Sequence, residues 1–131
     1  MIDITIPGQP FVQKRHRPSH RGGYYDPSSE DKKTIQWQLR AGNVKPRKPF
    51  TVSLMIEIIA YFETPKSWSK KKKREHEGQY RPKTPDADNI FKIYADAMNN
   101  YIYEDDAQIV RSVVEKRYST EPRTVIKIRG V

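Results

Sequence analysis

One segment constrains the fold of this chain more than any other. Between Thr51 and Phe62 the residues alternate between two sets. The first set is Val52, Leu54, Ile56, Ile58, Ala60 and Phe62; the second is Ser53, Met55, Glu57, Ile59 and Tyr61. A period of two places each set on one face of a β-strand. The pattern therefore predicts a central strand that is covered on the first face and half covered on the second.

The apolar residues of the chain are mostly β-branched. Ile and Val number 21, against two Leu, and such side chains fit pleated strands better than helices. Leu, Ile, Val and Phe together make up only 27 of 131 residues, which is near the level of about 20% below which disorder becomes common. We expect a thin core that rests mainly on strands, within a single domain over 1–131.

The remaining elements follow from periodicity and from turn residues. Alternation predicts a first strand over 2–6, and the region 8–25 is expected to be a basic loop because no helix or strand pattern persists in it. Helices are predicted over 28–41, over a short basic stretch that ends near 77, and over 87–99, with strands over 108–118 and 123–129. We expect the last strand to run antiparallel to the one before it, and Trp37 to lie against a neighbouring loop. The order β-α-β-α-α-β-β predicts an α+β fold with a mixed sheet packed against helices.

Composition excludes several classes of protein. Without cysteine there is no disulfide framework, thiol nucleophile, zinc ribbon or iron–sulfur cluster. The N-terminus lacks the features of a signal peptide, and the longest apolar stretch, Leu54 to Phe62, is too short to cross a bilayer. We therefore expect a cytoplasmic protein that has no membrane partner and no small-molecule cofactor.

Charge is distributed unevenly along the chain. The net charge is +9, yet the segment 86–106 has six acids and one base, which gives it −5 and leaves +14 for the other residues. The candidate polyanion-binding side chains lie in two basic segments: Lys14, Arg15, Arg17 and Arg21, and Lys70, Lys71, Lys72, Lys73 and Arg74. Two separated basic segments favour a nucleic-acid partner over a solubility role or a membrane surface.

The acids of 86–106 have a structural interpretation. Asp86 could cap a helix, Asp88 in its first turn would complement the helix dipole, and Asn89 could reach back as a capping partner. Asp105 and Asp106 suit a turn. Lys92 could form a simple ion pair with Asp88, four residues earlier, and we expect Asp96 only to solvate its side of the helix.

Considered together, the same acids also fit a metal site. Carboxylates at a helix start and at the start of a following strand can converge, and convergent carboxylates repel one another unless a cation is present. Mg²⁺ binds through a few carboxylates and leaves room for phosphate oxygens. The ammonium of Lys92 could stabilise charge that develops on a phosphate. The three histidines lack zinc spacing and there is no Gly-rich phosphate loop, whereas a glycosidase pair would leave the +14 unexplained.

One stretch resembles a known family. Pro85-Asp86-Ala87-Asp88-Asn89-Ile90-Phe91-Lys92, then Asp96-Ala97-Met98-Asn99, then Glu104-Asp105-Asp106-Ala107-Gln108-Ile109-Val110, is similar to the core pattern of the RusA family of Holliday-junction resolvases. The resemblance implies a homodimeric endonuclease that depends on Mg²⁺, with Mn²⁺ as a possible substitute, and nicks four-way DNA junctions symmetrically.

The resemblance also assigns residues. It implies that Asp86, Asp88 and Asp106 bind the metal, that Lys92 joins them in catalysis, and that Asn89 and Asp105 orient these groups. The chain departs from the family pattern at Pro85, where some members have Arg, and at Met98, where the pattern has Leu. The run Lys70 to Arg74 has no counterpart in the family core. The competing hypotheses are a non-catalytic basic nucleic-acid-binding module and a nuclease of the same fold that cuts branched or flapped DNA.

Overall fold

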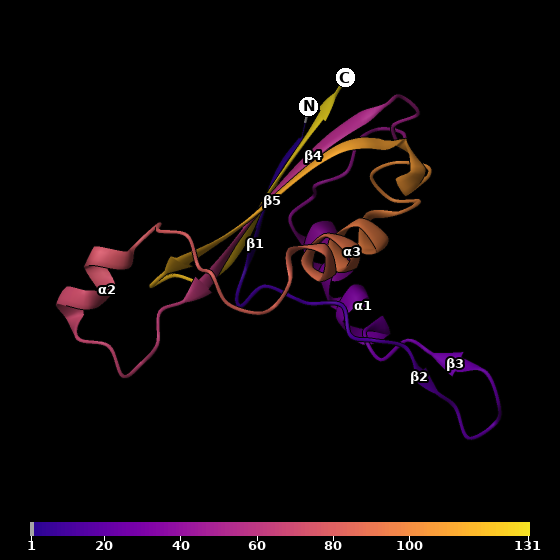
Figure 1. Cartoon of the computed structure of the whole chain (residues 1–131). Helices are drawn as coiled ribbons and strands as arrows, with labels where there is room; N and C mark the ends of the chain where they lie inside the picture. The colour runs from indigo at the N-terminus through magenta and orange to yellow at the C-terminus, as the bar shows by residue number, and fades with distance from the viewer. Residues whose placement is uncertain (1) are drawn as a thin grey trace.

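A four-stranded mixed sheet is the frame of the molecule. The computed structural model describes residues 2–131, and its sheet has the strand order β1-β6-β4-β5 (Figure 1). The strands are β1 (Ile2–Pro7), β4 (Leu54–Glu63), β5 (Ile109–Ser119) and β6 (Arg123–Gly130). β6 is antiparallel to both β1 and β4, whereas β5 is parallel to β4. The predicted α+β class and mixed sheet are confirmed.

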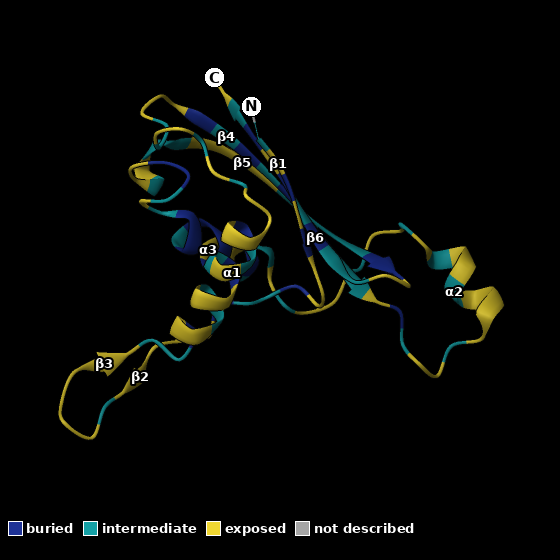
Figure 2. Cartoon of the chain, turned by 180° about the vertical axis from the view of Figure 1, so that it is seen from behind, coloured by how far each residue is buried: buried dark blue, intermediate teal, exposed yellow. Residues whose placement is uncertain are grey.

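Two helices cover one face of this sheet. α1 (Ser29–Ala41) and α3 (Ala87–Met98) lie together on the same side (Figures 1 and 2). The core consists of their apolar stripes and the inward side of the strands. Its members include Ile35 and Leu39 of α1, Ile90, Ile93 and Tyr94 of α3, and Ile4, Ile56, Ile58, Ile126 and Ile128 of the sheet. On the opposite face of β4, Met55, Glu57, Ile59 and Tyr61 are half-buried, as the alternation predicts.

Two basic elements project away from this frame. α2 (Lys70–His76) lies on a long excursion between β4 and α3, and a small hairpin of β2 (Arg17–Pro18) and β3 (Tyr24–Tyr25) extends at the other end of the view (Figure 1). The hairpin contradicts the predicted loop over 8–25. Its turn is closed by a bond from the Ser19 N–H to the Gly23 carbonyl at 2.9 Å. Gly22 and Gly23 have φ of 85° and 73°, which glycine adopts readily, so the Gly-Gly pair was the missed signal.

Two other predictions need correction, and the predicted direction of the last strand is confirmed without the pairing. β4 begins at Leu54, so Val52 is 51% exposed instead of buried. β6 does run antiparallel to β5 in direction, but the two are not neighbours, because β4 lies between them. The chain between β4 and β5, which includes α2 and α3, crosses over the sheet, so β5 runs parallel to β4. β5 therefore occupies the edge position next to β4. Trp37 is 71% exposed on α1 rather than covered by a loop.

Candidate active site

Asp86 and Asp88 lie at the start of α3: Asp88 is in the first turn, as predicted, whereas the Asp86 side chain does not form the predicted cap. Asp86 occupies the N-cap position with extended backbone, but within residues 2–131 its carboxylate accepts no capping hydrogen bond. The first turn is instead closed by the Asp86 carbonyl, which accepts from the Asn89 and Ile90 N–H groups. The Asp88 carboxylate accepts only locally, from the Asn89 N–H at 3.0 Å. Both carboxylates are exposed and available to a ligand.

Asp105 and Asp106 have different surroundings. Asp105 caps the short 3₁₀ helix η1 (Asp106–Gln108): its carboxylate accepts from the Ala107 N–H at 3.1 Å, and its N–H donates to Gln108 Oε1 at 2.9 Å. The Ala107 bond lowers the pKa of Asp105. Asp106 is half-buried, and burial followed by the neighbouring charges of Asp105 and Asp96 raises its pKa. Asp105 is therefore committed to a structural bond, whereas burial and the neighbouring acids disfavour the charge of Asp106, and the charge of Lys92 offsets them only in part.

Lys92 contacts a partner that the sequence did not predict. Its Nζ donates to Asp96 Oδ2 at 3.2 Å, so the predicted pair with Asp88 is wrong. The expectation that Asp96 only solvates the helix is also wrong, since its side chain is 26% exposed and accepts from Lys32 Nζ at 3.1 Å. Lys32 donates in turn to Asp26 Oδ2 at 2.6 Å. A chain of ion pairs thus connects α1 and the base of the hairpin to Lys92.

A pocket of about 330 Å³ lies beside Lys92 and Asn89. The basic segment after β1 forms its other wall, with Gln13, Lys14, Arg15 and His16. Gln13 holds this segment in place: its N–H donates to the Asn89 carbonyl at 2.9 Å, and its Nε2 donates to Asp26 Oδ1 at 2.9 Å. The Oε1 of the same side chain is buried and has no partner among the described residues. The pocket gathers cationic side chains around Lys92, which suits an anionic group such as a phosphate.

The predicted metal ligands are not assembled into one cluster. The described part of the chain has no group of three or more His, Cys, Asp or Glu side chains placed to hold a metal ion. Asp88 and Asp96 are eight residues apart on α3, which is about 12 Å along a helix. Asp106 lies near the Asp96 end, because its N–H donates to Oδ1 of Asn99, the C-cap residue of α3, at 3.0 Å. The structure therefore brings together Asp106, Asp96 and Lys92 and leaves Asp86 and Asp88 at the other end of the helix.

Comparison with known proteins identifies the family of this fold and site. Residues 7–129 match the family described as Endodeoxyribonuclease RusA. The chain belongs to the RusA family. It is also 38% identical over 137 residues to the uncharacterized protein YqaN of Bacillus subtilis strain 168, a match that covers 99% of this chain and 96% of that protein. Membership of the RusA family implies an endodeoxyribonuclease that acts on Holliday junctions.

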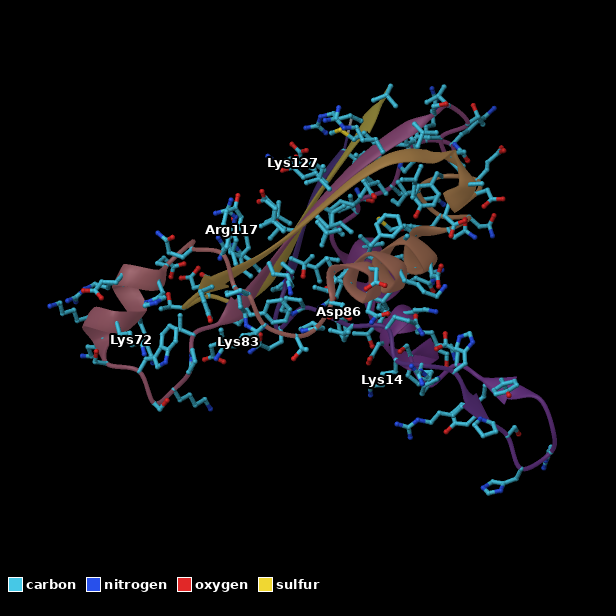
Figure 3. The ribbon with its side chains drawn as sticks, viewed as in Figure 1. Lys14, Lys72, Lys83, Asp86, Arg117 and Lys127 are labelled. Atoms are coloured by element: carbon cyan, nitrogen blue, oxygen red, sulfur yellow. The ribbon has the colours of Figure 1, made fainter. Side chains whose placement is uncertain are left out.

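The basic residues of this RusA family member lie on both sides of the acids. Lys14, Arg15, Arg17 and Arg21 are exposed on the segment that leads into the β2–β3 hairpin, and Lys70, Lys71, Lys72 and Arg74 are exposed on α2, with Lys73 half-buried. Figure 3 shows Asp86 between Lys14 and Lys83, with Lys72 farther along towards α2. No helix among residues 2–131 is long and apolar enough to cross a membrane. The arrangement offers cationic side chains on either side of the candidate catalytic acids.

Several residues of the site were absent from the sequence prediction. Gln13 and His16 lie near Lys92 because the basic segment folds back onto α3, whereas Asp26 and Lys32 connect to Lys92 through Asp96. No spacing pattern marks such a long-range contact. The Asp26-Pro27-Ser28 sequence signals a helix start, and it is the folded structure that makes the same Asp26 the anchor of the hairpin.

Proposed function

We propose that this protein is a Mg²⁺-dependent endodeoxyribonuclease that resolves four-way DNA junctions by paired, symmetric nicks, acting as a homodimer. Membership of the RusA family is the observation that supports this class of reaction. The exposed carboxylates of Asp86 and Asp88, on the helix whose Asn89 and Lys92 line a cationic pocket, support the location of the site on this chain. Two nicks on opposed strands require two sites, which a two-fold dimer supplies.

The side chains of the candidate site are of the kind that binds a hard divalent ion. Asp86 and Asp88 offer exposed carboxylate oxygens within one turn, and Mg²⁺ commonly binds proteins through one or two carboxylates while keeping several waters. Asp106, whose pKa is raised first by burial and which lies at the Asn99 end of α3, is proposed as a further ligand that joins Asp86 and Asp88 when the ion binds. When bound, such an ion activates water and neutralises charge on the phosphate. Asn89 and Asp105 are proposed to orient these carboxylates.

Lys92 is proposed to act on the phosphate. Its ammonium lies at the pocket that also contains Lys14 and Arg15. A cation placed there would stabilise the charge that develops on the phosphate oxygens during hydrolysis. The basic residues of the hairpin segment and of α2 would contact the phosphates of the junction arms and position the site without reading sequence.

The experiment that tests the proposal compares the wild-type protein with Asp88→Asn on labelled junction, flap and duplex DNA. Asp88→Asn should abolish nicking in Mg²⁺ while junction binding survives. Glu104→Gln, which changes an exposed acid of the same segment, should nick at the wild-type rate. Resolution of a synthetic four-way junction by Asp88→Asn at the normal rate would show that the assigned site is wrong.

The same panel separates the competing hypotheses. A non-catalytic DNA-binding module predicts no cleavage with any divalent ion, and no effect of Asp106→Asn except on stability. A flap or branched-DNA nuclease of the same fold predicts that the junction is a poorer substrate than the flap. Preferred, paired cleavage of the four-way junction supports the proposal.

A further inference from the structure

The segment that follows α2 forms an additional edge on the sheet. The Gly78 N–H donates to the Tyr118 carbonyl at 2.8 Å, the Tyr118 N–H to the Gln79 carbonyl at 2.9 Å, and the Arg81 N–H to the Lys116 carbonyl at 2.8 Å. Gly78 makes the turn from α2 into this segment with φ of 77°, which a side chain would disfavour. The backbone around Tyr80 is therefore fixed to β5 on both sides.

Tyr80 presents one face of its ring to solvent. The residue is 63% exposed, and the Arg117 guanidinium covers the other face of the ring with Cζ 4.3 Å from the ring centroid. Arg117 is itself held, since Nε donates to Glu115 at 3.1 Å and Nη1 to the Gly78 carbonyl at 2.6 Å. An exposed aromatic ring usually lowers its exposure by folding onto the surface. Here backbone pairing and a fixed guanidinium hold the ring outward.

A pocket of about 590 Å³ lies next to this ring. Lys72 and Lys83 line it together with Tyr80 and Trp68, and Glu75 contributes an acid whose carboxylate is 4.0 Å from Lys71. The Lys72 ammonium lies 4.5 Å from the Trp68 ring centroid. Figure 3 places Lys72, Lys83 and Arg117 on the part of the molecule between α2 and Asp86. The pocket thus combines an aromatic plane with positive charge on one continuous surface.

Most of the aromatic rings in this region have a structural role. Trp68, His76 and Tyr118 pack against one another with centroids 4.6 to 5.9 Å apart, and this small cluster attaches α2 to the end of the sheet. Tyr80 takes no part in those ring contacts, so its outward position is not needed to hold α2. Arg117 and a bond from the Tyr80 hydroxyl to Glu115 Oε1 at 3.5 Å fix the ring on β5, and its outer face stays open to solvent.

We propose that this pocket binds an unpaired nucleotide of DNA, with its base stacked on Tyr80 and its phosphates held by Lys72 and Lys83. Stacking on Tyr80 needs a flat ring, and every nucleotide base supplies one. An acidic peptide would contact the lysines but would not stack on Tyr80. The inference rests on the proposed function, because base pairs at the branch point of a junction open more readily than those within a duplex and then place unpaired bases close to the site of cleavage. Tyr80 precedes Asp86 by six residues, at most about 20 Å of chain, so the pocket lies within a few nucleotides of the candidate active site.

The test is a binding measurement in EDTA, which removes cleavage from the readout. Fluorescence anisotropy would follow a labelled short oligothymidylate and an abasic oligonucleotide of the same length on three proteins: the wild type, Tyr80→Leu and Tyr80→Phe. Tyr80→Leu should weaken oligothymidylate binding roughly 5- to 150-fold, whereas Tyr80→Phe keeps the ring and should stay within about twofold. The abasic oligonucleotide should bind all three proteins equally, because only phosphate contacts remain. Circular dichroism of each variant confirms that it is folded.

Two results would overturn the inference. One is oligothymidylate affinity that is unchanged in Tyr80→Leu. The other is an equal loss for the abasic oligonucleotide, which would assign the pocket to phosphates alone. Failure of the proposed function is a separate result, because it appears as absence of junction nicking by the wild-type protein in Mg²⁺. Base-dependent binding through Tyr80 in a protein that cuts nothing would support the pocket and reject the nuclease.

Discussion

The ammonium groups of Lys32 and Lys92 donate to the same oxygen of Asp96, Oδ2, at 3.1 and 3.2 Å. One cation comes from α1 and the other from α3, so a single carboxylate oxygen joins the two helices beside the candidate catalytic lysine. Lys32 also donates to Asp26, and although burial lowers its pKa, the hydrogen bonds to the two carboxylates outweigh that effect and raise it. The position of Lys92 therefore depends on an ion pair between helices that are distant in sequence.

Replacing Lys32 tests how much this network stabilises the fold. In Lys32→Met the carboxylates of Asp26 and Asp96, which are 23% and 26% exposed, lose their shared cation. Full burial of an unpaired charge costs about 3–5 kcal/mol, and partial solvent access reduces that cost, so we expect a loss of about 1–3 kcal/mol. Urea unfolding measures the change. Lys33→Met, at an exposed pair with Glu30 on the same helix, should change stability by less than about 0.5 kcal/mol. Equal losses of stability in the two variants would show that the ion pairs of Lys32 do not stabilise the fold.

Replacing Asp96 tests whether the same network positions Lys92. Asp96→Asn keeps the shape of the side chain and removes the charge that holds the Lys92 ammonium, while Lys32 retains Asp26. Because small displacements of a catalytic group are costly, junction nicking should fall roughly 10- to 100-fold with little change in junction affinity. Single-turnover cleavage and a gel-shift assay give the two quantities. A loss of affinity without a loss of rate would assign Asp96 to DNA binding instead.

The sheet and the helices could be predicted because their signals are local. The alternation around Ile56 and Ile58 and the stripe formed by Ile90, Ile93 and Tyr94 each specify an element and its buried face. The neighbour of each strand could not be predicted, because β4 separates β5 from β6 through a crossover that no local pattern encodes.

The residues of the site could be located from the sequence, but the contacts between them could not be predicted. Their motif marks Asp86, Asp88, Lys92 and Asp106, yet nothing in the spacing indicates that Lys92 pairs with the residue four positions after it instead of the one four positions before. The Asp96 carboxylate that Lys92 contacts is also bound by Lys32, which reaches it from α1 across 64 positions of sequence. A tertiary contact of this kind fixes side-chain partners that periodicity leaves open.

The carboxyl group of Asp26 should make stability depend on pH in acid. Burial raises its pKa, but hydrogen bonds from Lys32, Ser28 and Gln13 outweigh burial and lower the pKa from 3.8 to about 2. A lowered folded-state pKa contributes stability above the unfolded value, so the contribution is complete above about pH 4 and is lost as the pH falls towards 2. It amounts to roughly 2 kcal/mol. The free-energy gap between the wild type and Asp26→Asn should therefore narrow by that amount between pH 6 and pH 2. If the difference in unfolding free energy between the two proteins stays constant with pH, Asp26 does not make this contribution.

The Tyr94 hydroxyl should hold the basic segment against α3. It lies in the core, accepts from the Phe11 N–H at 2.9 Å and shares a hydrogen bond with Thr124 Oγ1 at 2.8 Å. Tyr94→Phe leaves both groups without their partner, which should cost about 1–3 kcal/mol in urea unfolding. Tyr101→Phe is the matched control, because the cations that lie over that ring at 5.7 and 5.4 Å need only its π-face. Similar losses in both variants would show that the Tyr94 hydroxyl has no special role.

The exposed charges of α2 should contribute to DNA binding in a way that salt can measure. Each phosphate contact with duplex DNA contributes about 0.9 to the slope of log affinity against log salt. The triple variant Lys70→Gln, Lys71→Gln and Arg74→Gln removes three exposed cations and should reduce the junction-binding slope by about 1 to 3. The matched control changes Lys45, Arg47 and Lys48 to Gln; these three exposed cations lie between α1 and β4, on a different part of the surface. Because that variant loses the same net charge, it corrects for the general attraction between a basic protein and DNA. Equal slopes for the two variants would mean that α2 acts only through net charge and does not contact the junction.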